Sequence, residues 1–326
     1  MDKKEFFSLA EDSIEGKIPD NDTYKGLLMI PDHEVSGMLC GADMIREHYF
    51  KKEVHLCTIC NGKSGKCSED CGFCSQSAFS KTDSPVYPLM KKEDLQRGGL
   101  YASQTPINRY SIVTTGKRLP KKEVSAVADA MAELPGKSIG KCASLGIIDY
   151  EDMQLLKSAG VNRYHHNLEA CKSFFSRICT THGYEERVNT ILAAKESGLE
   201  LCSGGIFGLG EGPEHILELA VALKELGVDS VPINFLTPIK GTPFESFHNL
   251  TPLRCLKIIA FFRYFLPDKE IIICGGREQN LGELHPIIFY AGASGIMTGN
   301  YLTTEGRTLD KDLEMIESLG FAVRKK

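Results

Sequence analysis

The sequence has 326 residues, of which 42% are hydrophobic and 25% charged, and its formal net charge is −5 at pH 7. This composition supports a large apolar core, and a mildly acidic chain without a basic stripe argues against nucleic acid as a partner. No segment approaches the roughly 18–20 continuous apolar residues that span a bilayer, and the N-terminal segment MDKKEFFSLAEDSIEGK lacks an apolar signal core. We therefore expect a cytoplasmic protein without a membrane segment.

The predicted elements begin with short helices over the first 50 residues, where Met38, Met44 and Ile45 recur at helical spacing. Eight strands follow, at residues 54–60, 109–114, 137–143, 162–168, 199–207, 230–235, 270–275 and 295–298. Amphipathic helical patterns lie between them, for example at 121–134, 213–226 and 253–265. Thr251 is predicted to cap the last of these helices, with Pro252 at its first position.

Strands that alternate with helices form parallel sheets with crossover helices, and eight such units predict an α/β fold of the (βα)8 TIM-barrel type. An open doubly wound sheet is the alternative. We see no sequence repeat and no low-complexity linker, so residues 1–326 are predicted to form one domain. Its parts are an N-terminal helical extension (1–50), the barrel core (51–298) and a C-terminal extension (299–326) that completes the active site.

The chain contains 12 cysteines, which need an explanation in a compartment where structural disulfides are rare. Cys40, Cys171 and Cys255 lie in helical patterns and are predicted to be small buried apolar residues. The other use of cysteine that the sequence suggests is metal ligation.

The segment CSEDCGFC places Cys67, Cys71 and Cys74 in the spacing C-x3-C-x2-C, directly after the first predicted strand. Barrel enzymes carry their active sites on the loops that follow the strands. Soft thiolates select iron–sulfur clusters, zinc or copper(I), and structural zinc sites favour four protein ligands. No fourth cysteine or histidine follows nearby, so the loop is predicted to hold a four-iron cluster with one open iron.

This spacing, with Phe73 just before the last cysteine, resembles that of the radical S-adenosylmethionine (SAM) enzymes. The resemblance implies that Cys67, Cys71 and Cys74 hold a 4Fe-4S cluster whose open iron binds the amino and carboxylate groups of SAM. An electron from the cluster would then cleave SAM into methionine and a 5′-deoxyadenosyl radical, which abstracts a hydrogen atom.

Further motifs make the chain similar to the biotin synthases over residues 53–320. In chain order they are SQS (75–77), YHHNLE (164–169), CSGGI (202–206), GLGE (208–211), VPIN (231–234), KGTP (240–243), GREQ (276–279) and LTT (302–304). The resemblance implies insertion of sulfur into dethiobiotin, with SAM consumed twice per product and the sulfur supplied by an auxiliary iron–sulfur cluster. It also implies an electron-donor protein of the flavodoxin or ferredoxin type and a homodimer.

The resemblance assigns SAM binding to Phe73, Asn167, Glu169 and Arg187. Glu169 can accept from ribose hydroxyls, and the planar guanidinium of Arg187 can bind both oxygens of the SAM carboxylate. A surface helix charge is the alternative interpretation for Arg187. Gly204 and Gly205 interrupt an apolar strand, which indicates either close approach of SAM or a bulge.

Substrate binding is assigned by the same resemblance to four residues. Asn167 is shared between SAM and the ureido group of dethiobiotin, and Asn234 matches the ureido-binding asparagine of the family. Thr303 and Thr304 match the pair that binds the carboxylate tail; without the resemblance they would be turn residues. His165 stands where the familiar motif has asparagine, so it is expected to alter the hydrogen bonds to the ureido group.

The auxiliary cluster is where the sequence departs from the family pattern. The familiar ligands are three cysteines and one arginine, and Cys142, Cys202 and Arg277 match three of them. The fourth position is Ser111, which is a poor iron ligand.

Two further cysteines lie on predicted strands, Cys57 on the first and Cys274 on the seventh. Strand side chains alternate, so Cys57 points into the barrel if Leu56 faces the helices. Arg277 is predicted to be a neighbour or a ligand of the auxiliary cluster, which is of the two-iron or four-iron type. The predicted cysteine ligands are Cys57, Cys142, Cys202 and Cys274, with Cys60 and Cys179 in reserve. Simple buried packing is the alternative for Cys57 and Cys274.

Two other functions remain open at this point. One is a related radical SAM enzyme, a maturase or mutase, acting on another small molecule; Asn234 and the threonine pair argue against it. The other is a non-catalytic iron–sulfur carrier, which would not need Asn167, Glu169 and Arg187 around an open iron.

Overall fold

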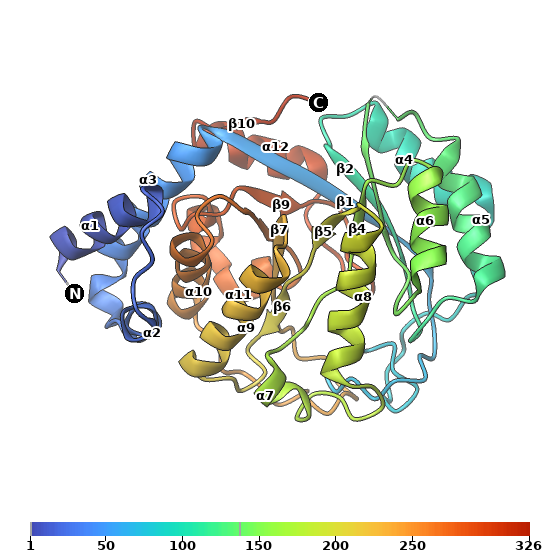
Figure 1. The fold of residues 1–326 in the computed structure, drawn as a ribbon, viewed down its shortest axis with the longest axis horizontal. Helices are drawn as coiled ribbons and strands as arrows, with labels where there is room; N and C mark the ends of the chain where they lie inside the picture. Colours follow the sequence, from blue (N-terminus) through green and yellow to red (C-terminus); the bar gives the residue numbers. More distant parts are fainter. Residues whose placement is uncertain (1, 137) are drawn as a thin grey trace.

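Parallel strands form a closed barrel in the computed structural model, which describes residues 2–136 and 138–326 (Figure 1). The barrel strands are β1 (Glu53–Lys63), β2 (Arg109–Thr114), β3 (Gly140–Ser144), β4 (Arg163–His165), β5 (Glu200–Cys202), β6 (Gly205–Phe207), β7 (Ser230–Phe235), β8 (Glu270–Ile273) and β9 (Gly295–Met297). Consecutive strands pair side by side, β5 and β6 both pair with β7, and β9 returns to β1. The predicted (βα)8 barrel is therefore confirmed, and the open-sheet alternative is wrong.

Helices surround the barrel. They are α4 (Lys92–Ser103), α5 (Lys121–Ala132), α6 (Tyr150–Ser158), α7 (Lys172–Phe175), α8 (Tyr184–Glu196), α9 (Pro213–Leu226), α10 (Pro252–Phe265), α11 (Arg277–Leu281), the 3-10 helix η2 (Gly282–Ile288) and α12 (Leu309–Ser318). The cap of α10 is as predicted, because the Thr251 side chain accepts a hydrogen bond from the Arg254 N–H at 3.2 Å. Among the described residues, none of these helices is both long and apolar enough to cross a membrane.

The N-terminal segment adds α1 (Lys3–Ile14), α2 (Asn21–Met29), the 3-10 helix η1 (Asp32–Glu34) and α3 (Val35–Phe50). These helices lie at one side of the barrel, where α3 packs against α10 (Figure 1). At the other end of the chain, β10 (Ala322–Val323) pairs in parallel with the first residues of β1. This short strand was not predicted.

The fifth predicted strand, at 199–207, is interrupted in the structure. A Cβ atom on Gly204 would lie 2.0 Å from the carbonyl oxygen of Pro232, and one on Gly205 would lie 2.6 Å from that of Glu169. The two glycines are thus required by close approach of neighbouring backbone, and the strand divides into β5 and β6. The predicted strand at 137–143 begins at a residue outside the described ones, and β3 starts at Gly140.

Two of the three cysteines predicted to be buried fillers, Cys171 and Cys255, are buried. The prediction for Cys40 is wrong, because this residue is exposed. Met38 and Ile45 lie on the face of α3 that is buried in the core. Cys40 lies on the opposite face of the same helix and is therefore exposed.

Candidate functional site

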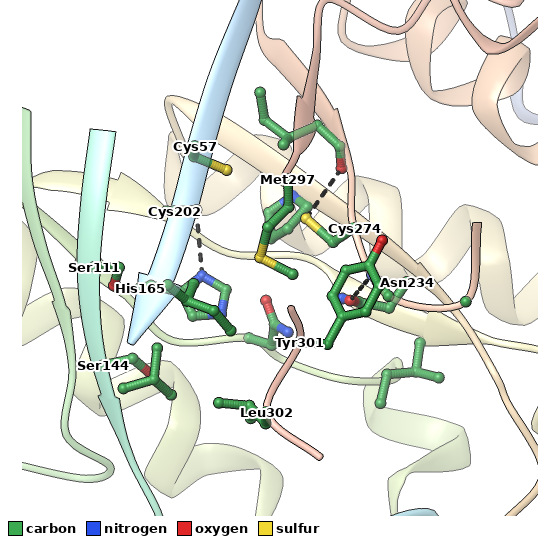
Figure 2. Close-up of a pocket in the computed structure, with 18 of the residues that line it drawn as sticks. Cys57, Ser111, Ser144, His165, Cys202, Asn234, Cys274, Met297, Tyr301 and Leu302 are labelled. Carbon is green, nitrogen blue, oxygen red and sulfur yellow. Dashed lines mark hydrogen bonds between the residues drawn. The ribbon is translucent and has the colours of Figure 1, made fainter. Parts of the chain in front are cut away.

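A cavity of about 370 Å³ occupies the barrel interior. Its lining extends from Cys74 and Thr303, on loops that follow strands, to Arg109 and Arg163 at the first positions of β2 and β4. Within it lie four cysteines, here called the inner cysteines: Cys57, Cys142, Cys202 and Cys274. Figure 2 shows Cys57 on β1 and Cys274 in the segment just after β8. Cys57 lines the cavity, as strand alternation predicts, and its neighbour Leu56 is fully buried in the apolar core outside this cavity.

The three-cysteine loop (residues 67–74) follows β1 and is fixed by its own backbone. The Cys67 N–H donates to the Gln76 carbonyl at 2.7 Å, the Ala78 N–H donates to the Cys67 carbonyl at 2.8 Å, and the Cys74 N–H donates to the Cys71 carbonyl at 2.9 Å. Burial raises the pKa of the Cys67 thiol, and it raises the pKa of Cys74 to about 11. Since metals bind the thiolate form, binding here releases protons.

Cys71 has a further neighbour that the sequence analysis placed elsewhere. The Cys71 and Cys179 sulfurs and a ring nitrogen of His182 all lie within 4.8 Å of one another, which is a spacing suited to a metal ion. The contact with Cys179 raises the pKa of the Cys71 thiol well above its usual range. Cys179 therefore lies beside the three-cysteine loop and not among the inner cysteines. Cys60, the other reserve candidate, packs against the apolar core outside the barrel.

Asn167 and Glu169, which are predicted to bind SAM, follow β4 and line the cavity. Phe73, in the three-cysteine loop, lines it as well. The Asn167 amide is held in place: its oxygen accepts from the Gly204 N–H at 3.1 Å, and its nitrogen donates to Glu169 at 3.2 Å. Glu169 has a φ of 67°, a left-handed conformation that non-glycine residues rarely adopt. Such backbone strain is often found at ligand sites.

Arg187 lies on α8, next to this pair. Its Nη1 donates to the Asn167 carbonyl at 2.9 Å and lies 3.9 Å from a Glu169 carboxylate oxygen. Its Nε donates to Nε2 of His182 at 3.1 Å, and Nδ1 of His182 lies 2.7 Å from the carboxylate of Glu69. Glu69 belongs to the three-cysteine loop, so this chain of contacts links the loop to the predicted SAM-binding residues. No local pattern in the sequence indicates His182, which follows α7 in an irregular segment.

The predicted substrate residues also line the cavity. The Asn234 oxygen accepts from the Gly275 N–H at 3.0 Å, and its nitrogen lies 3.4 Å from the Gly205 carbonyl, so one amide hydrogen remains for a ligand. Thr303 shares a hydrogen bond of 2.9 Å with Ser75, next to Cys74. This contact joins the C-terminal loop to the three-cysteine loop at one rim of the cavity.

The inner cysteines are buried or half-buried, and burial raises the pKa of each of these thiols. Two of them also have a polar side chain beside the sulfur. Nδ1 of His165 lies 3.3 Å from the Cys202 Sγ, and Nη1 of Arg109 lies 3.9 Å from the Cys142 Sγ. His165 thus contacts a sulfur, which the sequence analysis did not anticipate.

His55 is a residue that the sequence analysis missed. Its Nδ1 lies 3.1 Å from the carboxylate of Glu270, whereas its Nε2 is buried without a hydrogen-bond partner among the described residues. The ring lines the same cavity as the inner cysteines. Metal-ligating histidines usually bond a carboxylate through the second ring nitrogen, and His55 makes such a contact with Glu270. Its partner is 215 positions away along the chain, and no local pattern indicates the pair.

Charged side chains close the N-terminal end of the barrel below the inner cysteines. Arg163 bonds Glu270 at 2.7 Å and Glu200 at 2.9 Å, and Arg109 bonds Glu200 at 2.6 Å. Burial by itself would raise the pKa of Glu270, but the contacts with His55 and Arg163 hold it well below its usual range. We call this set the ionic layer: His55, Arg109, Arg163, Glu200 and Glu270.

Arg277 is fully buried and is directed toward the C-terminal helix. Its Nη2 pairs with Asp312 on α12 at 2.7 Å, and its Nε donates to the Tyr301 hydroxyl at 3.1 Å. The remaining Nη1 contacts His285. Because every guanidinium nitrogen has a protein partner, this geometry favours Arg277 as a neighbour of the inner cysteines and not as a ligand.

Two family models match the chain. Residues 63–223 match the radical SAM superfamily, and residues 232–322 match the biotin and thiamin synthesis associated domain. The chain also resembles solved structures in fold. It has a TM-score of 0.85 to a methylornithine synthase at 20% identity, covering 97% of both chains. The TM-score to the FeFe-hydrogenase maturase HydG from Carboxydothermus hydrogenoformans is 0.79 at 16% identity, covering 98% of this chain and 79% of that one.

Sequence relatives are much more similar. A biotin synthase from Desulfatibacillum aliphaticivorans is 54% identical over 98% of this chain and 98% of the relative. A biotin synthase from Geobacter sulfurreducens is 46% identical over 97% of both chains. Matches of this strength along the whole length show that the chain belongs to the biotin synthase family of radical SAM enzymes.

Proposed function

We propose that this protein is a biotin synthase that inserts sulfur into dethiobiotin, and that the inner cysteines hold the cluster that supplies the sulfur. The observation that carries the proposal is a single cavity with Cys74 at one end and the inner cysteines within it. A radical formed at the first site and a sulfur donor at the second therefore face the same cavity inside the barrel. The shared cavity matters, because a carbon radical must meet its target and not solvent.

The family implies a 4Fe-4S cluster and SAM, and the three-cysteine loop suits both. Its three thiols leave the fourth position of a cubane for SAM. In this proposal Glu169 accepts from the ribose hydroxyls, Arg187 binds the carboxylate, and Phe73 lines the adjoining wall. When bound, the cluster and SAM supply the radical; the role of these residues is to orient SAM above the cavity.

Buried polar atoms near the inner cysteines support the proposal that this part of the cavity holds a cluster. Four of them are buried without a hydrogen-bond partner in the described chain, and all belong to residues that line the cavity near the inner cysteines: His55 Nε2, Arg109 Nε, Ser111 Oγ and Ser230 Oγ. Buried polar groups normally have partners, so such a set favours a polar occupant. Four thiols suit a four-iron cluster at least as well as a two-iron one. When bound, that cluster supplies the sulfur.

Substrate recognition is proposed for Asn167, Asn234, Thr303 and Thr304. Asn234 has a fixed amide with one free donor, which suits a ureido oxygen. The Thr303 contact with Ser75 and a 2.8 Å bond from Asn61 to the Leu302 carbonyl hold the C-terminal extension against the barrel mouth. These contacts support the proposal that residues 299–326 complete the active site. A one-electron donor protein of the flavodoxin or ferredoxin type and a homodimer belong to the same proposal.

Iron and sulfide analysis tests the auxiliary site. Cys57→Ala and Cys274→Ala, made singly, are expected to lose the auxiliary iron and sulfide after anaerobic reconstitution, because each removes an inner thiolate. Cys60→Ala is the matched control on the same strand as Cys57, with its side chain outside the barrel. Unchanged iron in both variants would remove these residues from the ligand set.

Loss of the Asn234 amide tests the substrate assignment. Asn234→Ala is expected to weaken dethiobiotin binding about tenfold, the cost of roughly one hydrogen bond, without changing iron content. Binding is measured by titration of the reconstituted protein in the presence of SAM. Equal affinity in the variant and the parent would contradict the role of Asn234 in substrate binding.

A separate test concerns catalysis itself. If the reduced parent protein left SAM uncleaved with both clusters intact, the hypothesis of a non-catalytic iron–sulfur carrier would replace that of an enzyme.

A further inference from the structure

His165 is the imidazole that directly contacts an inner cysteine in the described structure. Its Nδ1 lies 3.3 Å from the Sγ of Cys202, as the dashed line in Figure 2 marks. His165 ends β4 and Cys202 ends β5, and the two residues are paired in register. The contact is therefore set by strand pairing and not by a flexible side chain reaching across the cavity.

The direction of this hydrogen bond follows from the state of the sulfur. A free thiol can donate to a ring nitrogen, but a cysteine that binds iron is a thiolate and carries no proton. With a metal on Cys202, the imidazole must therefore be the donor. An N–H bond to a ligand sulfur draws negative charge away from iron and stabilises the reduced state of a cluster.

We propose that His165 is a positioning residue of the sulfur-donating site: its Nδ1–H bonds the Cys202 sulfur and raises the reduction potential of the auxiliary cluster. The inference rests on the proposed function, since it requires that cluster on the inner cysteines. When bound, the cluster would supply the sulfide and take up the one electron that is left over when a carbon radical bonds to a sulfide ion. A donor beside Cys202 therefore favours sulfur release.

The other inner sulfurs differ in their surroundings. Cys142 has Arg109 at 3.9 Å, so a second donor lies on the same side of the cavity. In the described residues, the hydrogen bonds of the Cys57 and Cys274 sulfurs go to main-chain carbonyl oxygens, of Ile296 at 3.8 Å and of Ile272 at 3.6 Å. The two donors, Arg109 on β2 and His165 on β4, thus lie on the side of the site formed by β2 to β5, where they would stabilise added negative charge.

The test compares the reconstituted parent protein with variants in a redox titration followed by electron paramagnetic resonance. His165→Leu removes the donor and is expected to shift the auxiliary cluster to a more negative potential. His165→Gln keeps an N–H group, so the potential of its auxiliary cluster is expected to lie between those of the parent and of His165→Leu. Ser144→Ala, at a cavity-lining residue seen in Figure 2, is the matched control and is expected to keep the parent potential.

The potential of the cluster in the three-cysteine loop is expected to stay unchanged in all variants. An auxiliary potential in His165→Leu equal to that of Ser144→Ala, at full iron content, would overturn the inference while leaving the proposed function intact. Absence of auxiliary iron from the parent protein would instead overturn the proposed function. If the leucine variant binds no auxiliary iron, His165→Phe, which keeps a ring without a donor, takes its place.

Discussion

Arg277 and Asp312 form an ion pair whose side chains are both 0% exposed, with the Nη2 and Oδ2 atoms 2.7 Å apart. Arg307 also reaches Asp312, with 3.2 Å between Nε and Oδ1. On the other side, Arg277 bonds the Tyr301 hydroxyl, and Tyr301 lines the cavity. A single buried carboxylate on α12 therefore supports one wall of the proposed substrate site.

Asp312→Asn is expected to lower the free energy of unfolding by about 3–5 kcal/mol, because it leaves a buried guanidinium without its counter-charge. Denaturant unfolding of the cluster-free chain measures this change. Asp310→Asn, at an exposed position on the same helix, is the control, with an expected change under about 1 kcal/mol. Equal losses in the two variants would show that the pair contributes nothing beyond helix charge.

Among the elements, the break between β5 and β6 gives the site its shape. The break lets the segment after β4 enter the sheet: the Glu169 N–H donates to the Gly204 carbonyl at 3.1 Å, and the Ile206 N–H donates to the Glu169 carbonyl at 2.9 Å. Asn167 accepts from the Gly204 N–H in the same place. An uninterrupted fifth strand would leave these two predicted SAM ligands without a backbone frame.

Gly204→Ala is expected to destabilise the fold by about 1–3 kcal/mol and to weaken SAM binding, because the new methyl group would overlap the Pro232 carbonyl. Thermal unfolding and SAM titration of the reconstituted protein measure the two effects. Gly26→Ala in α2 serves as the control, since a Cβ there meets nothing within 4 Å. Loss of stability in both variants alike would argue against a special role for the break.

For the whole molecule, the ionic layer closes one end of the barrel and the C-terminal segment reinforces it. Arg324, just after β10, bonds Glu270 at 3.3 Å. Glu270 in turn contacts His55 on β1 and Arg163 on β4, so one carboxylate joins distant parts of the chain. Buried charges of this kind depend on the protonation of their partners.

Acid is expected to destabilise the protein through this layer. The folded-state pKa of Glu270 lies below its ordinary value of 4.5, so its contribution is present above that pH and is lost as the pH falls through the depressed value. Burial also lowers the pKa of His55 below 6.5, and protonating a buried neutral imidazole costs stability in the same direction. Glu270→Gln is expected to be less stable at about pH 7 and to lose less stability than the parent as the pH falls from about 5 into the acid range below 4.5. The measurement is the free energy of urea unfolding of both proteins as a function of pH. If the curves of the parent and of Glu270→Gln ran parallel, Glu270 would not be the source of the acid sensitivity.

The sequence predicts features that depend on local pattern and misses those that depend on distant partners. Alternation of strands and helices predicts the barrel, and strand alternation predicts that Cys57 faces inward. The direction of Arg277 was not predictable, because its partner Asp312 lies 35 positions along the chain. The break at Gly204 was not predictable for a similar reason, because the Pro232 carbonyl that requires it belongs to a neighbouring strand. His165 was identified as unusual, but only strand pairing brings it to Cys202.

The ionic layer lies across the end of the barrel opposite the three-cysteine loop. If the inner cysteines hold the proposed cluster, replacement sulfide and iron would reach them through the cavity mouth, between the three-cysteine loop and the C-terminal loop. Dethiobiotin is proposed to use the same opening. Bound substrate or product would then block rebuilding of the cluster, so product release would have to come first.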